Sequence, residues 1–136
     1  MRLTHAALLN DHFACLDRED HGRYHIFTAA DGPFADPHDH AEWGFWSEVK
    51  FGGYVEEIFS LERPGHTELV TRRQGDRFRV ESNHIHRITH LLEDICITHV
   101  APDVHTPDPH AWAYQFRDDG IWRRPVFGGE WTRFAP

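Results

Sequence analysis

The chain has 136 residues, of which 40% are hydrophobic and 13% aromatic, and its formal net charge is −8. This length fits one domain, and the composition supports a packed core, so disorder is a poor description of the whole chain. The acidic balance and the lack of a basic stripe argue against nucleic-acid binding. The sequence has no run of about 18 apolar residues and no signal-peptide layout, so we expect a cytoplasmic protein without a membrane span.

Histidine and cysteine are the two residue types that carry information here. Thirteen residues are histidine, the commonest metal ligand and the side chain that titrates near neutral pH. The two cysteines, Cys15 and Cys96, lie far apart and do not make a disulfide framework, so we expect two buried free thiols. What the histidines do depends on where they fall along the chain.

The N-terminal segment has the apolar spacing of a helix. Within residues 4–17, apolar side chains recur every three or four positions, and Thr4 is a candidate N-cap. We therefore predict one short helix that lies against the outside of the body. Residues 23–30 follow as a predicted strand, which the turn sequence at residues 31–33 closes.

The stretch from residue 38 to residue 54 combines a histidine pair with a turn signal. His38 and His40 stand at i and i+2, so an extended strand would place both imidazoles on one face, where they could grip one metal ion. Isolated pairs of this kind are more often surface histidines. A Gly52-Gly53 pair then predicts a hairpin turn. In that hairpin the side chain of Glu56 faces inward, and a buried carboxylate needs a partner.

A second informative segment covers residues 84–100, which we predict to form a hairpin with Glu93-Asp94 as its turn. His84, His86 and His90 share one predicted face with aliphatic residues, and His99 joins that face from the second strand. A face that mixes aliphatic side chains with four histidines is not a solvated surface. Some of these histidines should line a pocket or bind a ligand.

Short strands at roughly ten-residue spacing, separated by Gly, Pro and Asp, predict an all-β sandwich or barrel. The H-x-H pair, the later Gly-Gly pair and the H-R-I sequence at His86 resemble the cupin superfamily, a small jelly-roll barrel. The usual glutamate of the first cupin motif is missing here, since its position falls at Phe45 or Trp46. The resemblance is closer to small bacterial cupins over residues 25–125, at Trp43, Ser47, Gly52, Gly53, Tyr54, Glu56, His86, Arg87, Ile88, Trp112, Gly120 and Trp122.

The resemblance implies a single cupin domain over residues 1–136. Residues 1–20 would form the helical segment, residues 23–125 the β-barrel and residues 126–136 an aromatic tail. Small cupins pair through exposed strands, so a homodimer is an expected partner arrangement, with Trp131 and Phe134 as candidate interface residues.

The resemblance also implies a divalent metal ion held by His38, His40 and His86, as in thiol dioxygenases. Iron(II) is the leading cofactor, and Zn or Ni stays open. Two alternatives also stay open at the site. Glu42 would give a two-histidine, one-carboxylate site, and His84 competes with His86 because both share a strand face.

The expected function is that of a metal-dependent enzyme acting on a small molecule, foremost a non-haem Fe(II) dioxygenase. The alternatives are a redox-neutral Zn or Ni lyase or isomerase, and a non-catalytic ligand-binding cupin. Tyr54 and His99 are the candidate catalytic residues. Tyr54 would orient a substrate unless it is a barrel-wall aromatic, and His99 would act in acid–base chemistry unless it is a core histidine.

Overall fold

The computed structural model describes residues 3–10, 12–18, 22–40, 44–102, 111–126 and 128–136. Within these ranges the chain is all-β, as predicted, and none of the described segments is a helix of the kind that could cross a membrane. The strands are β1 (Leu3–Asn10), β2 (Phe13–Arg18), β3 (Gly22–Phe27), β4 (Phe45–Phe51), β5 (Gly53–Phe59), β6 (Thr67–Arg73), β7 (Arg77–Val80), β8 (Ile85–Leu91), β9 (Cys96–Pro102), β10 (Trp112–Arg117), β11 (Gly120–Pro125) and β12 (Thr132–Ala135).

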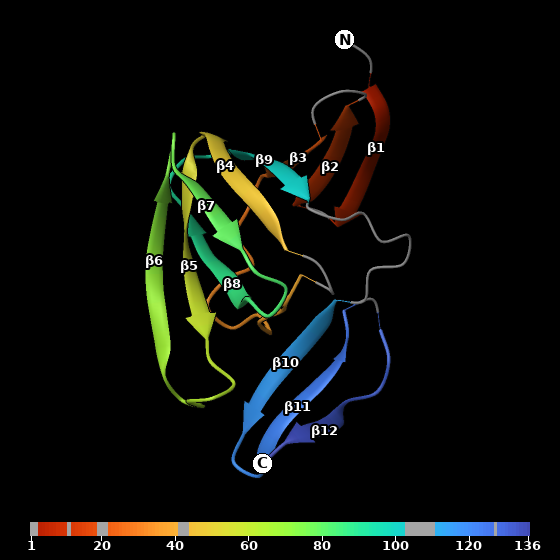
Figure 1. The fold of residues 1–136 in the computed structure, drawn as a ribbon, viewed down its shortest axis with the longest axis vertical. Helices are drawn as coiled ribbons and strands as arrows, with labels where there is room; N and C mark the ends of the chain where they lie inside the picture. Colours follow the sequence, from red (N-terminus) through yellow and green to blue (C-terminus); the bar gives the residue numbers. More distant parts are fainter. Residues whose placement is uncertain (1–2, 11, 19–21, 41–43, 103–110, 127) are drawn as a thin grey trace.

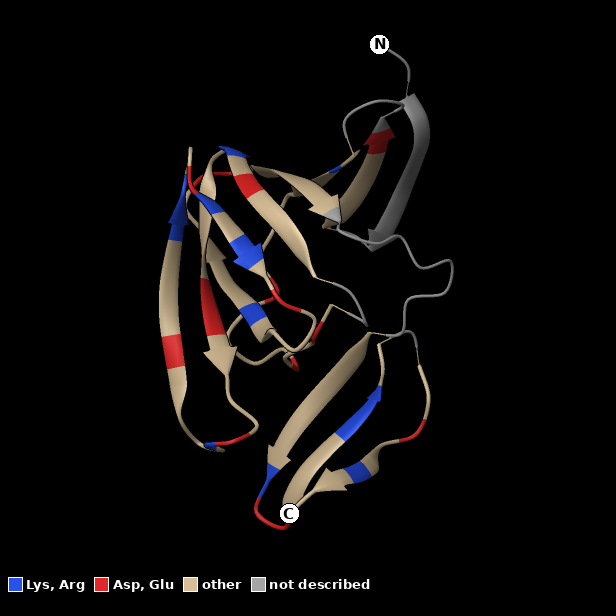
Figure 2. Cartoon of the chain, in the orientation of Figure 1, with Lys and Arg blue, Asp and Glu red and all other residues tan. Residues whose placement is uncertain are grey.

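The strands form one sheet of six and two sheets of three (Figure 1). The larger sheet has the order β1-β2-β3-β9-β4-β7, and the smaller ones have the orders β6-β5-β8 and β10-β11-β12. The hydrogen bonds of the described strands do not close these sheets into a barrel, so that part of the fold prediction is not confirmed. In Figure 2, Lys and Arg are spread over several strands among acidic residues and do not form one basic stripe in the described part of the chain.

His38 joins the two three-stranded sheets. It forms isolated β-bridges with His86 of β8 on one side and with Ala113 of β10 on the other. The amide of His38 donates to the carbonyl of His86 at 2.8 Å, and the amide of His86 donates back at 2.9 Å. The amide of Tyr114 donates to the carbonyl of Pro37 at 2.8 Å. The histidine pair therefore lies in a short extended segment between two sheets and not in a long strand.

The predicted N-terminal helix is wrong. β1 and β2 form an antiparallel pair, with Ala6 opposite Leu16 and Ala7 opposite Cys15, and β2 continues the sheet by pairing with β3. The apolar spacing does fit a helix, but the sequence Asn10-Asp11 in its middle favours a turn. A hairpin also lets β2 complete its hydrogen bonds against a neighbouring strand, and this tertiary gain overrides local periodicity.

Both predicted central hairpins are also wrong, and for one reason. β4 pairs with β7 and β9, whereas β5 pairs with β6 and β8, so Gly52-Gly53 carries the chain from one sheet to another. Residues 92–95 do the same between β8 and β9. The two connections touch, because a Cβ on Gly52 would clash with the carbonyl oxygen of Ile95. Turn residues predict that the chain reverses, but they do not specify the sheet that the next strand joins.

The hydrophobic core lies between the six-stranded sheet and the β6-β5-β8 sheet. One cluster joins Val49, Tyr54, Ile88 and Cys96 across the two sheets, and burial of each large apolar side chain contributes about 1.5–3 kcal/mol. Cys15 and Cys96 are both buried and free, as predicted. A separate cluster of Ile85, Tyr114 and Ile121 attaches the C-terminal sheet to β8.

Asp39 anchors the histidine segment on the C-terminal sheet. Its side chain is 7% exposed, accepts a hydrogen bond from the amide of Trp112 at 2.8 Å, and accepts another from the hydroxyl of Tyr114 at 2.9 Å. Burial, followed by the charge of Asp39, raises the pKa of Tyr114 to about 12, so its hydroxyl stays a donor. The hydrogen bonds of Asp39 thereby hold the backbone between His38 and His40 in place against β10.

Replacing Asp39 with alanine is expected to lower the free energy of unfolding by about 2 kcal/mol, because two buried donors lose a charged acceptor. Urea denaturation measures this difference. Asp36→Ala is the matched control, since the hydrogen bond that Asp36 accepts from Gln115 is exposed. Equal losses in the two variants would show that Asp39 does not anchor the segment.

Candidate metal centre

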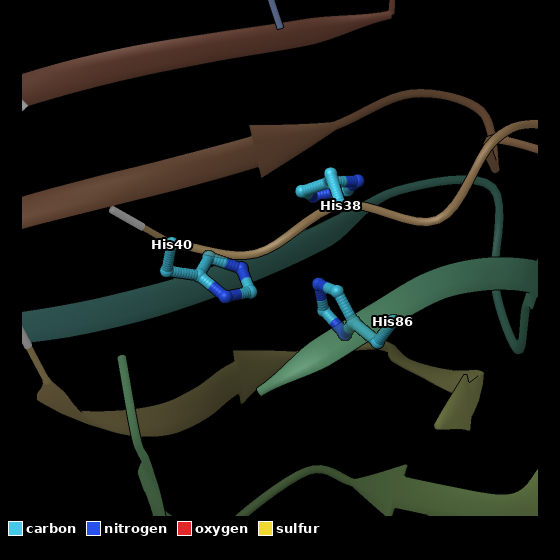
Figure 3. Close-up of side chains that lie close together, drawn as sticks. All are labelled: His38, His40 and His86. Carbon is cyan, nitrogen blue, oxygen red and sulfur yellow. The ribbon is translucent and has the colours of Figure 1, made fainter. Parts of the chain in front are cut away.

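Three histidines from two segments meet between the sheets (Figure 3). The candidate ligand nitrogens of His38, His40 and His86 all lie within 4.8 Å of one another. Ring centroids are 5.4 Å apart for His38 and His40, 5.0 Å for His38 and His86, and 4.6 Å for His40 and His86. The structure thus brings together the three residues that the sequence proposed as ligands.

The backbone explains why these side chains converge. Directly opposed residues of an antiparallel pair point to the same face, and His38 lies directly opposite His86. His40 is two residues further along the extended segment, which returns it to the face of His38. Asp39, between them, points the other way and binds β10. The i, i+2 spacing read from the sequence therefore has the expected geometric result.

The imidazoles of His38 and His40 are held in the neutral form that binds metal ions. Burial, followed by the proximity of His86, lowers the pKa of His38 to about 4, and the same two causes lower the pKa of His40 well below its ordinary value. The Nδ1 atom of His40 is buried and has no hydrogen-bond partner among the residues that the structure describes. Since buried polar atoms normally have partners, this orphaned nitrogen fits a site that takes a metal ion as its missing partner.

These shifted pKa values predict that the metal-free protein loses stability as the pH falls. Burial lowers the pKa of His25 to about 3 and that of His38 to about 4, from 6.5 in the unfolded chain. Between pH 6.5 and the folded-state pKa values, the unfolded state therefore binds protons that the folded state does not bind, so the free energy of unfolding falls as the pH falls. We expect a loss of about 1.4 kcal/mol per pH unit for each histidine. Urea titrations at pH 7 and pH 5 test this, and equal stabilities would contradict it.

Glu56 is a buried carboxylate that contacts His86 of the cluster and the neighbouring His84. It is 0% exposed, and its Oε1 atom lies 2.6 Å from Nε2 of His84 and 3.2 Å from Nδ1 of His86. The Nε atom of Arg72 donates to Oε2 at 3.2 Å. Burial raises the pKa of Glu56, but the hydrogen bonds from His84 and His86 outweigh burial and hold this pKa well below its usual range.

The contact with Glu56 sets the tautomer of His86. An ionised carboxylate only accepts hydrogen bonds, so Nδ1 of His86 must carry the proton that it donates. The Nε2 atom is then left as a lone-pair donor for a metal, and Figure 3 shows a ring nitrogen of His86 facing His38 and His40. Metal-binding histidines commonly have such a carboxylate partner, which orients the ring. The inward carboxylate predicted from the sequence is confirmed, and its partners are His84 just before β8, His86 of β8 and Arg72 of β6.

A second set of potential ligands, Glu56, His84 and His86, also lies within 4.8 Å. The guanidinium of Arg72 contacts the same carboxylate, and its positive charge would repel a cation placed there. The three-histidine set is therefore the better candidate. His84, the alternative to His86 in the sequence, is a partner of Glu56. Glu42, the other alternative ligand, lies outside the described residues.

The two candidate catalytic residues lie in different surroundings. Tyr54 is 5% exposed and packs with Val49, Ile88 and Cys96, and burial followed by the charge of Glu56 raises its pKa well above the usual value. Tyr54 is therefore protonated within the core. Its role as a substrate contact stays a prediction.

His99 lies on the other side of β9. Cys96, Thr98 and Val100 are the buried residues of that strand, and His99 alternates with them, its ring centroid 5.0 Å from that of Tyr24. His90 is exposed, beyond a register shift in the pairing of β5 with β8. The structure thus brings neither His90 nor His99 to the three-histidine cluster. The sequence analysis placed both on the face of His86 by pairing β8 with β9, whereas β8 pairs with β5, and β9 pairs with β3 and β4.

Comparisons with known proteins bear on the fold. No protein-family model and no curated protein matches the chain. The structure is similar to Drosophila melanogaster CENP-C bound to CAL1, with a TM-score of 0.54, 12% identity, and coverage of 71% of this chain and 74% of that chain. It is also similar to the capsular polysaccharide assembling protein CapF from Staphylococcus aureus, with a TM-score of 0.55 and 16% identity. That match covers 82% of this chain and 31% of CapF.

These likenesses are consistent with a cupin-like fold. At such low identity they bear on the fold alone, and the chain spans about a third of CapF. The site must therefore be judged from its own geometry.

Proposed function

We propose that the protein is a metal-dependent enzyme acting on a small molecule, foremost a non-haem Fe(II) dioxygenase of the cupin type. His38, His40 and His86 would hold the ion. The observation that carries this proposal is the meeting of three largely buried imidazoles whose ligand nitrogens lie within 4.8 Å of one another. Burial keeps two of them, His38 and His40, in the neutral form. Such an arrangement costs stability unless a ligand satisfies the orphaned Nδ1 of His40.

The protein groups around the site have distinct roles in this proposal. An Fe(II) ion held by three imidazoles would supply redox chemistry and leave coordination positions open for a substrate. Glu56 would keep His86 oriented, and Asp39 would keep the His38–His40 segment in place. The surrounding core, including Tyr54, would limit the access of water. None of these roles requires Glu56 to contact the metal itself.

Two other functions compete with the iron enzyme. A Zn or Ni ion on the same three histidines would support redox-neutral chemistry as a Lewis acid. A non-catalytic binding domain is favoured by the likeness to CENP-C, whose structure is that of a complex with CAL1. The identity of the ion separates the first two, and its absence would favour the third.

Elemental analysis of protein purified without chelators tests the proposal. We expect about one equivalent of Fe in the wild type and none in the His38→Ala/His40→Ala variant. His90→Ala, which changes an exposed histidine, should retain the metal. One equivalent of Zn or Ni would move the function to redox-neutral catalysis. No metal, even after anaerobic addition of Fe(II), would overturn the enzyme proposal.

A further inference from the structure

His84 is a fourth histidine at the cluster, and the proposed function gives it no role. It stands just before β8, two residues from His86, and both side chains contact Glu56, so they point to one side of the chain. The ring centroid of His84 lies 5.0 Å from that of His86 and 6.1 Å from that of His40. His84 therefore borders two of the three candidate metal ligands.

One ring nitrogen of His84 is fixed by a buried carboxylate. Its Nε2 atom lies 2.6 Å from Oε1 of Glu56, and the other oxygen of Glu56 accepts a hydrogen bond from Nε of Arg72 at 3.2 Å. Glu56 is 0% exposed and paired with a guanidinium, so it is ionised and only accepts hydrogen bonds. Nε2 of His84 must therefore carry a proton, and the contact fixes the direction of the ring.

The other ring nitrogen of His84, Nδ1, is open. Within the part of the chain that the structure describes, this atom forms no hydrogen bond, and 15% of the side chain stays exposed. A neutral imidazole that donates from Nε2 has a lone pair on Nδ1. A histidine that a carboxylate orients through one nitrogen presents the other nitrogen in a fixed direction. His84 thus offers an aimed hydrogen-bond acceptor beside the candidate metal centre.

The chemistry of the centre indicates which ligands would gain from this acceptor. A divalent ion makes the proton of a coordinated hydroxyl group or water more acidic, and that proton needs an acceptor. His38, His40 and His86 would use their lone pairs on the ion. Glu56 already accepts hydrogen bonds from two histidines and from Arg72. Among these residues, His84 is the one with an acceptor to spare.

We propose that His84 is a ligand-contacting residue whose Nδ1 accepts a hydrogen bond from a hydroxyl group coordinated at the His38–His40–His86 centre, so that the site selects chelating ligands with a hydroxyl group, such as 2-hydroxy carboxylates. This inference rests on the proposed function, because it requires the metal. The carboxylate arm of such a ligand would offset the positive charge of an ion held by imidazoles. Glu56 would position the metal ligand His86 and the ligand-contacting His84 together.

Two probes on the Co(II)-loaded protein test the proposal, because the visible absorption of cobalt responds directly to a ligand at the metal. Glycolate carries the hydroxyl group, and methoxyacetate has a methyl group in place of its proton. We expect the wild type to bind glycolate about tenfold or more tightly than methoxyacetate. In His84→Gln, whose amide can still donate to Glu56 but which lacks the Nδ1 acceptor, this preference should fall about tenfold, with about one equivalent of cobalt retained.

Two further variants make the result specific. His84→Asn places an amide oxygen close to the position of Nδ1, so it should restore part of the preference for glycolate. His90→Gln changes an exposed histidine in the same way and should behave like the wild type.

The outcomes separate this inference from the proposed function. If the wild type does not bind cobalt at the three histidines, both fail. If cobalt binds with one equivalent, but the wild type shows no preference for glycolate or His84→Gln keeps it, only the role of His84 is overturned. Loss of cobalt in His84→Gln and His84→Asn, with both variants folded by circular dichroism, would make His84 part of the metal-holding set and would also overturn it.

Discussion

Replacing His86 with alanine is expected to lower the affinity for a divalent metal by about 100-fold or more, while the strands stay paired. Loss of a residue that only orients a ligand typically costs 10- to 100-fold, so loss of a ligand should cost at least as much. The backbone amide and carbonyl of His86 still bond to His38 in the variant, so the segment should remain in place. Competition with a chelator of known affinity measures the change.

His84→Ala is the comparison that makes this result specific. His84 is two residues away, just before β8, and hydrogen-bonds the same carboxylate, but it does not belong to the three-histidine set. Its loss should reduce metal affinity far less than the loss of His86. If His84→Ala is the more damaging variant, the ion lies with Glu56, and the ligand assignment is wrong.

Changes at Glu56 are expected to have the largest effect on stability. Glu56→Ala removes the common partner of His84, His86 and Arg72, and removing one member of a buried ion pair typically costs about 3–5 kcal/mol. Glu56→Gln keeps the size of the side chain but can offer only one oxygen acceptor. We expect this variant to fold and to bind metal about 10- to 100-fold more weakly, because the orientation of His86 is no longer fixed.

Glu57→Gln serves as the control for this pair of variants. Glu57 is the next residue on β5, and it forms a partly exposed ion pair with Arg87 at 2.6 Å, away from the three histidines. Its replacement should leave metal affinity unchanged. Urea denaturation and chelator competition, carried out on all three variants, separate the stability effect from the metal effect. Metal affinity that is the same in Glu56→Gln and the wild type would show that the carboxylate does not orient His86.

The sequence predicted the location of most strands but not their partners. Alternation of apolar and polar residues is a local property, and the sequence predicted a strand over residues 23–30 where the structure has Gly22–Phe27. Whether the chain folds back onto the same sheet or crosses to another depends on contacts between distant segments. The close approach of Gly52 to Ile95 is one such contact, and no local pattern reveals it.

The sequence predicted the candidate metal ligands but not the contacts that surround them. His38 and His40 share a face through simple alternation, and this prediction needed no knowledge of pairing. The inward position of Glu56 was expected from a Gly52-Gly53 hairpin, whereas in the structure β5 pairs with β6 and β8. The contact of Glu56 with His86 depends on the pairing of β5 with β8.

The meeting of three distant backbone segments at His38 has a consequence for folding kinetics. Residues of β8, the histidine segment and β10 are far apart in the chain, so the metal-binding geometry exists only after long-range contacts have formed. A ligand that recognises only this late arrangement stabilises the native state without stabilising the transition state for folding. Bound metal should therefore slow the unfolding of this protein and leave its refolding rate almost unchanged, so that it adds kinetic stability.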